Sequence, residues 1–163
     1  MLYSTRQWTI VPMFRLLNYI HNVIGGGGNS LIYRLLLRKY TRTCESFNVF
    51  LPPQTMIGRG VFFPHGFPIV INPETSIGEF CVIHPCVLLG RDRGKAGAPV
   101  VGNNCFIGNG AKIIGNPRIG DYCFLSPGAI VTKDIPSESL VGAGINNILN
   151  SDGKRHVEMY QRR

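Results

Sequence analysis

The sequence predicts a mainly β fold: a parallel β-helix built from hexapeptide repeats, preceded by a short N-terminal helical segment. Two observations predict it. An aliphatic residue recurs every six residues through the middle of the chain, and glycine or asparagine usually stands close behind it. A period of six fits neither an α-helix nor a half-buried strand, and it is typical of a β-helix in which each hexad forms one short strand and a turn.

The six-residue register persists through most of the repeat region. Its positions are Ile57, Phe63, Ile71, Ile77, Ile83, Leu89, Val101, Ile107, Ile113, Ile119, Leu125 and Val131. The register slips by two residues before Ile71 and is interrupted between Leu89 and Val101, where one six-residue position has no aliphatic residue. We expect these side chains to point into a narrow shaft, while glycine and asparagine turn the corners, where a positive φ costs least.

The chain divides into three segments. We expect an N-terminal helical segment over 1–50, the β-helix over 51–145 and a polar C-terminal tail over 146–163, with a short helix in the tail as an alternative. In the first segment a run of four glycines ends at Gly28 and marks a break. Ser30 follows it and is placed to cap a second helix. At 163 residues, the sequence fits one domain.

The positive charge is concentrated near the N-terminus. The formal net charge is +8, and residues 1–54 carry six basic residues and one acidic residue. Residues 55–150 carry seven basic and six acidic residues, so the repeats lack the basic stripe of a nucleic-acid binder. We therefore expect no nucleic-acid partner. The basic N-terminal segment leaves open a peripheral contact with acidic lipid, against the simpler alternative of a solvated helix face.

Other features of the sequence limit which cellular compartment and which cofactors we expect. No apolar stretch reaches about 18 residues, and the N-terminus lacks the pattern of a signal peptide, so we expect a cytoplasmic protein. The odd number of cysteines and the absence of a Cys-x-x-Cys pair predict free thiols and no metal site. These cysteines are Cys44, Cys81, Cys86, Cys105 and Cys123.

Two histidines lie within the repeats and are the candidates for chemistry. His65 stands at the register slip, between prolines and a glycine, and His84 directly follows the inward position Ile83. They are 19 residues apart, and a coil of three hexads takes about 18 residues, which predicts that they stack on one edge of adjacent coils. Neutral histidine is a natural general base near pH 7. The alternative for each is an outward side chain without a role.

A charged insertion interrupts the repeats between Gly90 and Val100. It runs from Arg91 to Pro99, contains four charged residues and has no inward aliphatic residue. In a solenoid such an insertion forms a loop on one face, often the binding face. The alternative is a tolerated loop with no role.

Several motifs give the sequence a family resemblance. Phe63-Pro-His-Gly66, the Ile-Gly hexads, Ile107–Gly115 and Val131–Pro136 resemble the serine acetyltransferase branch of the hexapeptide-repeat acyltransferases, which includes polysaccharide and sugar O-acetyltransferases. The resemblance covers about 50–145. It implies a left-handed β-helix, a homotrimer with active sites between neighbouring subunits, and acetyl-CoA as the acetyl donor.

The resemblance assigns roles to particular residues. His65 matches the catalytic base, and we add His84 as a second catalytic residue because of its spacing. The expected acetyl-CoA contacts are Asn109, Gly110, Ala111, Ser126, Gly128 and Lys133, with Lys133 near the phosphates. The expected acceptor contacts are Phe67, Arg91, Asp92 and Arg93.

The sequence also departs from the serine enzymes. Phe50 and Pro64 stand where those enzymes carry aspartates that serve the base, and Gly97-Ala98 stand where they carry Arg-His before a proline. Asp92 or Glu74 are candidates for the missing carboxylate. We therefore expect an O-acetyltransferase that acts on a sugar or a surface-polysaccharide precursor. The alternatives are a serine O-acetyltransferase of cysteine biosynthesis and a non-catalytic trimeric scaffold. A carbonic-anhydrase-like metal site would need three histidine ligands, and the repeats contain two.

Overall fold

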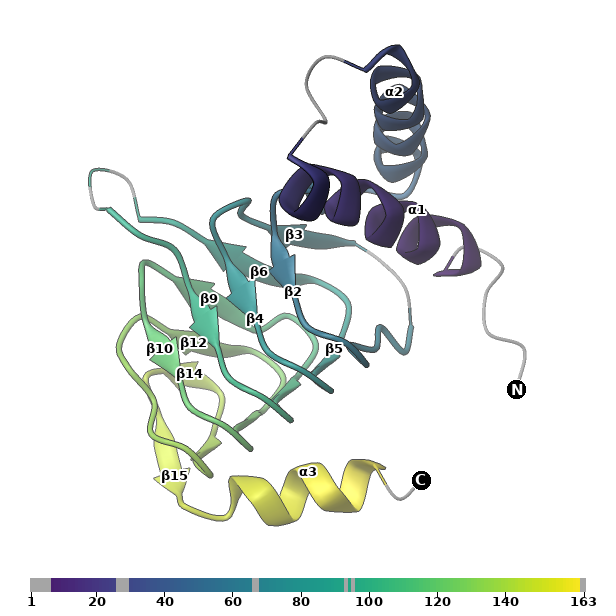
Figure 1. Cartoon of the computed structure of the whole chain (residues 1–163). Coiled ribbons are helices and arrows are strands. Elements are labelled where there is room, and N and C mark those ends of the chain that lie inside the picture. Colours follow the sequence, from purple (N-terminus) through teal and green to yellow (C-terminus); the bar gives the residue numbers. More distant parts are fainter. Residues whose placement is uncertain (1–6, 26–29, 66–67, 93, 95, 162–163) are drawn as a thin grey trace.

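The computed structural model describes residues 7–25, 30–65, 68–92, 94 and 96–161. Two helices precede the repeats (Figure 1). Helix α1 spans Gln7–Tyr19 and continues as a π-helical segment, η1, over Ile20–Ile24. Helix α2 spans Leu31–Ser46. The hydroxyl of Ser30 accepts a hydrogen bond from the backbone N–H of Tyr33, which confirms the predicted N-cap.

The repeats form a three-sheet solenoid. Sheet I contains β1 (Val49–Phe50), β3 (Ile69–Ile71), β6 (Val87–Gly90), β9 (Lys112–Ile114), β12 (Ala129–Val131) and β14 (Gly144–Ile145). Sheet II contains β2 (Met56–Ile57), β4 (Ser76–Ile77), β7 (Val100–Val101) and β10 (Arg118–Ile119). Sheet III contains β5 (Val82–Ile83), β8 (Phe106–Ile107), β11 (Phe124–Leu125), β13 (Leu140–Val141) and β15 (Ile148–Asn150).

Each coil of the solenoid passes through sheets I, II and III in turn. Neighbouring strands are parallel, except that β15 pairs antiparallel with β13. We use two names for the turns between sheets. Edge III–I is the column of turns that lead from sheet III back to sheet I, and edge I–II is the column that leads from sheet I to sheet II. The described residues of the charged insertion, 91, 92, 94 and 96–99, lie on edge I–II, between β6 and β7.

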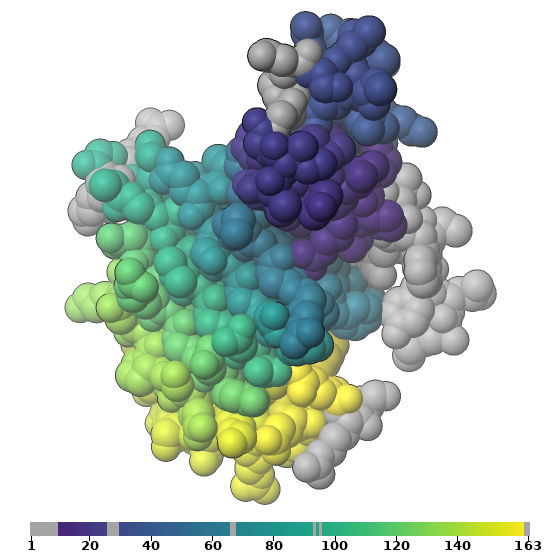
Figure 2. Space-filling model, viewed as in Figure 1, coloured from purple at the N-terminus to yellow at the C-terminus, as the bar shows by residue number. Residues whose placement is uncertain are grey.

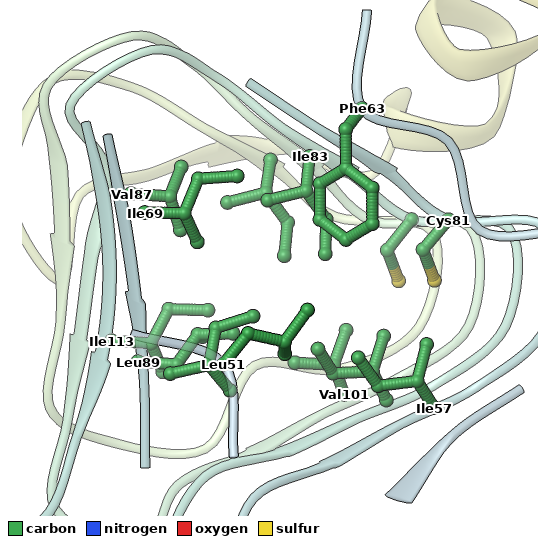
Figure 3. Close-up of a cluster of buried hydrophobic side chains, with 14 of the residues drawn as sticks. Leu51, Ile57, Phe63, Ile69, Cys81, Ile83, Val87, Leu89, Val101 and Ile113 are labelled. Carbon is green, nitrogen blue, oxygen red and sulfur yellow. The ribbon is translucent and has the colours of Figure 1, made fainter. Parts of the chain in front are cut away.

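The inward positions fill the shaft as predicted. The expected shaft residues Ile77, Ile83, Val101, Ile107, Ile119 and Leu125 are all buried. In sheet III, Ile83, Ile107, Leu125 and Val141 stack in register, one from each coil. Figure 3 shows such side chains converging on the centre of the solenoid. This packing is why the six-residue period is so strict, since a one-residue shift would turn aliphatic side chains outward.

A column of cysteines lies beside the shaft. Cys81, Cys105 and Cys123 are buried, occupy the same place in successive coils, and each donates its thiol to a carbonyl of the next coil at 3.1 Å. The acceptors are the carbonyls of Gly102, Gly120 and Pro136. All five cysteines are free, as predicted, and Cys86 is the exposed one.

Helix α1 lies across the first coil and covers its apolar end. Its side chains Ile10, Phe14 and Leu17 are buried and join the core of the shaft. Arg15 donates hydrogen bonds to the carbonyls of Ile57 and Gly58, at 2.5 and 2.7 Å. A solenoid needs such a cap because an end coil has no neighbour on one side. Among the described residues, no helix is long and apolar enough to cross a membrane.

The C-terminal segment covers the outer face of sheet III. Helix α3 spans Gly153–Gln161, and its Val157 is buried against Val82 and Phe106. The rings of Phe106 and Phe124 stack at 4.3 Å beneath the helix. Figure 1 shows α3 beside the last coils, at the opposite end of the molecule from α2. The residues expected to form a polar tail therefore include a helix with one apolar face.

Candidate active site

The structure brings His65 and His84 together on edge III–I. His65 lies in the turn that precedes β3, and His84 directly follows β5 in the next coil. Their ring centroids are 5.5 Å apart, with the rings tilted by 57°. His65 is exposed and His84 is half-buried. The stacking that their spacing predicts is confirmed, and the pair presents one accessible imidazole beside one partly desolvated imidazole.

Tyr160 of helix α3 completes this group. Its hydroxyl lies 3.1 Å from Nε2 of His84, within hydrogen-bond distance. The ring of His84 also lies against Phe106, with 4.8 Å between the ring centroids, and Phe106 in turn contacts Tyr160 at 4.6 Å. The orientation of His84 is therefore set by contacts with two separate parts of the chain.

The surroundings of His84 favour its neutral form. Burial lowers the pKa of His84 from its ordinary value, and the neighbouring charge of His65 lowers it further. A neutral imidazole offers one donor and one acceptor nitrogen. If the Tyr160 hydroxyl donates to Nε2, the proton of His84 lies on Nδ1.

Edge III–I continues from the histidines as a strip of small residues. Asn109, Gly110, Ser126 and Gly128 all lie on it. The N–H of Gly110 donates to the carbonyl of Pro85, and the N–H of Gly128 donates to that of Asn109, so successive turns stack directly. Gly110 and Gly128 have positive φ, and a Cβ on either would meet nothing within 4 Å. The strip therefore has open space beside its backbone, which a narrow ligand could approach.

Two of the expected acetyl-CoA contacts do not present a side chain to this strip. The side chain of Ala111 is fully buried in the shaft, and its backbone N–H and carbonyl both bond within the solenoid. Lys133 is exposed but follows β12, which places it on edge I–II rather than beside the glycines. The strip on edge III–I thus contains four of the six residues expected to contact acetyl-CoA.

Of the expected acceptor contacts, the two that the structure describes, Arg91 and Asp92, do not lie on the edge that carries the histidines. Arg91 lies on edge I–II, where its Nη1 contacts Oε1 of Glu74 at 3.2 Å, and Asp92 follows it, half-buried. Phe67 and Arg93 lie outside the described residues. Glu74, considered above as a carboxylate partner for His65, is paired instead with Arg91 on a different edge of the solenoid.

Phe50, which stands where the serine enzymes carry an aspartate, lines a surface groove. Phe50 is exposed on the outer face of sheet I and lines an apolar groove between α2 and the first coil, together with Tyr40 and Leu51.

The described residues contain no group of three or more His, Cys, Asp or Glu that could hold a metal ion. The contact of His84 with Tyr160 is the feature that sequence reasoning missed.

Comparison with known proteins agrees with this architecture. Residues 98–133 match the bacterial transferase hexapeptide family, described by its six repeats. The chain belongs to the hexapeptide-repeat superfamily. A serine acetyltransferase of Synechococcus elongatus is 32% identical over 105 residues, which is 63% of this chain and 43% of that relative. The chain spans about half the length of the curated relatives it matches.

Solved structures show the same fold. Soybean serine acetyltransferase complexed with serine has a TM-score of 0.72 and 26% identity, over 86% of this chain and 56% of that one. A Brucella abortus serine acetyltransferase in complex with coenzyme A has a TM-score of 0.77 and 22% identity, over 90% of this chain and 57% of that one. The sequence predicted a hexapeptide solenoid with N-terminal helices, and the similarity to these structures confirms that prediction.

Proposed function

We propose that the protein is an O-acetyltransferase that uses acetyl-CoA, with His65 as the general base. One observation carries the proposal. The histidine pair and the open glycine strip lie on the same edge of the solenoid, so a base adjoins a strip of backbone that a narrow thioester could approach. The similarity to serine acetyltransferases supports the same chemistry.

In the proposed reaction, an imidazole nitrogen of His65 takes the proton of the acceptor hydroxyl while that oxygen attacks the thioester carbonyl. The C–S bond then breaks, and the departing thiolate of coenzyme A takes the proton back from His65. Backbone N–H groups at the turns of edge III–I would stabilise the negative charge that develops on the carbonyl oxygen. The histidine is neutral before and after each turnover, as a general base near pH 7 must be.

His84 and Tyr160 are proposed to position His65. Because His84 is held by the Tyr160 hydroxyl and by Phe106, it presents a fixed, neutral ring to His65. In the serine enzymes that the sequence resembles, carboxylates serve the base. Here His84, which is held by Phe106 and Tyr160, adjoins His65 with 5.5 Å between the ring centroids.

The comparisons support L-serine as the acceptor more directly than the sugar hydroxyl expected from the sequence. The relatives named above are serine acetyltransferases, and the soybean protein was solved with serine. The sugar or surface-polysaccharide precursor is the second candidate, because Phe50, Pro64 and Gly97-Ala98 replace polar residues of the serine enzymes. We propose both acceptors for test, with serine first.

A homotrimer would explain where the remaining expected site residues lie. Arg91, Asp92 and Lys133 are on edge I–II, away from the histidines of the same chain. In a three-sided solenoid, a trimer can set edge I–II of one subunit against edge III–I of its neighbour. The loop would then contact the acceptor, and Lys133 would contact the coenzyme phosphates, across the subunit boundary.

The decisive experiment measures thiol release from acetyl-CoA by the purified full chain, with L-serine and with a panel of sugars and nucleotide sugars. We expect saturable release with at least one acceptor and a large loss in His65→Ala. His21→Ala is the matched control, because His21 lies on η1 and not on the edge of the solenoid that carries His65. Release that persists in His65→Ala would overturn the mechanism. The absence of release with every acceptor would favour the scaffold alternative.

A further inference from the structure

The end of the N-terminal helical hairpin exposes a group of large aliphatic side chains. Val23 and Ile24 close η1, and Leu31, Ile32 and Leu35 open α2; all five are between 53% and 71% exposed. We call them the apolar tip. The Tyr33 hydroxyl contacts Nδ1 of His21 at 3.4 Å, which holds the two helices together near this tip. Figure 2 shows α2 projecting beyond the rest of the molecule.

A cluster of cations adjoins the apolar tip on α2. Arg34, Arg38, Lys39 and Arg42 are all exposed, and Glu45 is the one acidic residue of the helix. Within the described part of the chain, no ion pair involves these four cations. The opposite face of α2 packs inward through Tyr33, Tyr40 and Cys44. The outward face is therefore apolar at its start and cationic along the rest of its length.

The helical period aligns the two kinds of residue. Leu31, Leu35, Arg38 and Arg42 follow one another at spacings of four, three and four residues, so they form a single stripe along one side of the helix. Such a stripe can meet a planar partner over its whole length. A patch of exposed aliphatic side chains on a soluble surface usually marks a contact.

We propose that this surface docks on an anionic lipid bilayer. The apolar tip would enter the boundary between headgroups and acyl chains, and the four cations would meet the anionic headgroups. Lipid is the partner that offers both chemistries in one plane, which is how interfacial helices bind. The proposal concerns placement on a surface and does not depend on the acetyl transfer proposed above.

The charges argue against the other occupants. In a twofold contact between copies of this chain, the cationic stripe would face its own image, and like charges would repel. A different face of the solenoid would offer little compensation, since 55–150 carry almost equal numbers of acidic and basic residues. A nucleic acid would satisfy the cations but would leave the apolar tip without a partner.

The test is sedimentation of the full chain with vesicles of phosphatidylcholine alone and with vesicles containing about one third phosphatidylglycerol. We expect binding to the anionic vesicles that weakens as salt is raised. Each cation near an anionic surface contributes roughly fivefold, so Arg38→Gln with Arg42→Gln should weaken binding about 25-fold. Leu31→Ser with Ile32→Ser should also weaken it, because less apolar surface enters the membrane.

Two control variants make the outcome specific. Lys112→Gln with Arg118→Gln removes two exposed cations from the solenoid, and Ile145→Ser with Ile148→Ser removes two exposed aliphatic residues from its far end. Both controls should bind vesicles as the unchanged protein does. Equal losses in the controls, or no binding to anionic vesicles, would overturn the proposal. So would a smaller assembly in Leu31→Ser with Ile32→Ser by analytical ultracentrifugation, since a second copy would then cover the tip.

Discussion

The hydroxyl of Tyr160 lies 3.1 Å from Nε2 of His84, although the two residues are 76 positions apart in the sequence. This contact ties the C-terminal helix to the edge that carries the proposed base. Because His84 also adjoins His65, the position of helix α3 bears on the geometry of the proposed reaction.

Replacement of Tyr160 by phenylalanine should isolate the hydrogen bond. The ring that packs on Phe106 is kept and the hydroxyl is lost, so turnover should fall by about two- to tenfold, the worth of one hydrogen bond. A hydroxyl that donates to Nε2 stabilises neutral His84, so its loss should raise the pKa of His84 in an NMR titration. Tyr122→Phe is the matched control, since Tyr122 contacts Lys154 instead. An unchanged titration of His84 in Tyr160→Phe would contradict the positioning role.

The lowered pKa of His84 predicts a pH dependence of stability. The unfolded chain binds a proton at this ring near pH 6.5, whereas the folded chain binds it only at lower pH. The contribution of neutral His84 to the free energy of unfolding is therefore fully present above about pH 6.5, and it is lost as the pH falls through the pKa that His84 has in the folded protein. Thermal unfolding of the protein and of His84→Gln at a series of pH values measures this. The destabilisation between neutral and mildly acidic pH should be smaller in His84→Gln, and equal slopes would refute the prediction.

Removal of the proposed base should slow turnover without unfolding the protein. His65 is exposed, so His65→Ala should leave the melting temperature nearly unchanged while it lowers kcat by about two to four orders of magnitude. If His84 serves the same step, the double variant should lose little more than His65→Ala alone. Additive losses in the double variant would show instead that the two histidines act separately.

The shaft should not tolerate a charge. Ile107 is fully buried between Ile83 and Leu125, so Ile107→Asp should prevent soluble folding, because an unpaired carboxylate in this position has no compensation. Ile107→Val should fold and lose about 0.5–1.5 kcal/mol. Val70→Asp is the control, because Val70 is 42% exposed on the outer face of sheet I. Circular dichroism and size-exclusion chromatography measure the outcome. If Ile107→Asp folds normally by both measurements, the assignment of the repeats is wrong.

Cys86 provides a chemical probe of edge III–I. It is the exposed member of the five free cysteines and has the same left-handed turn conformation as Gly110 and Gly128. In the folded protein, a maleimide should therefore modify one thiol rapidly and the other four slowly. Acetyl-CoA should slow this reaction if it binds along the glycine strip. Cys86→Ser should abolish the rapid phase, and a lack of protection at saturating acetyl-CoA would place the donor elsewhere.

Much of the fold could be predicted from the sequence because every repeat must meet the same requirement, an apolar side chain at the inward position. Each inward position such as Ile83 or Leu125 must be apolar, because the side chains of successive coils stack on one another in the shaft. The pairing of His65 with His84 followed from the same period. Ser30 was recognisable as a helix cap because a side-chain oxygen next to a helix start has a local function.

The contribution of helix α3 could not be read in the same way. A contact between Tyr160 and His84 depends on how a nine-residue helix folds back over sheet III, which no local pattern encodes. A signal was nevertheless present. Phe106 and Phe124 point outward directly before inward positions, and outward aromatic residues in a solenoid require a cover. The spacing of Val157 and Tyr160 fits one face of a covering helix.

The stacked coils also bear on how the chain reaches its native state. In sheet III, paired residues of successive coils are only 16 to 24 positions apart, so a new coil can add to the previous one by closing a short loop. The contact of Tyr160 with His84 spans 76 positions, so we expect it to form after the coils between them have stacked. The topology thus favours an order of assembly in which the solenoid grows coil by coil and Tyr160 reaches the histidine pair last.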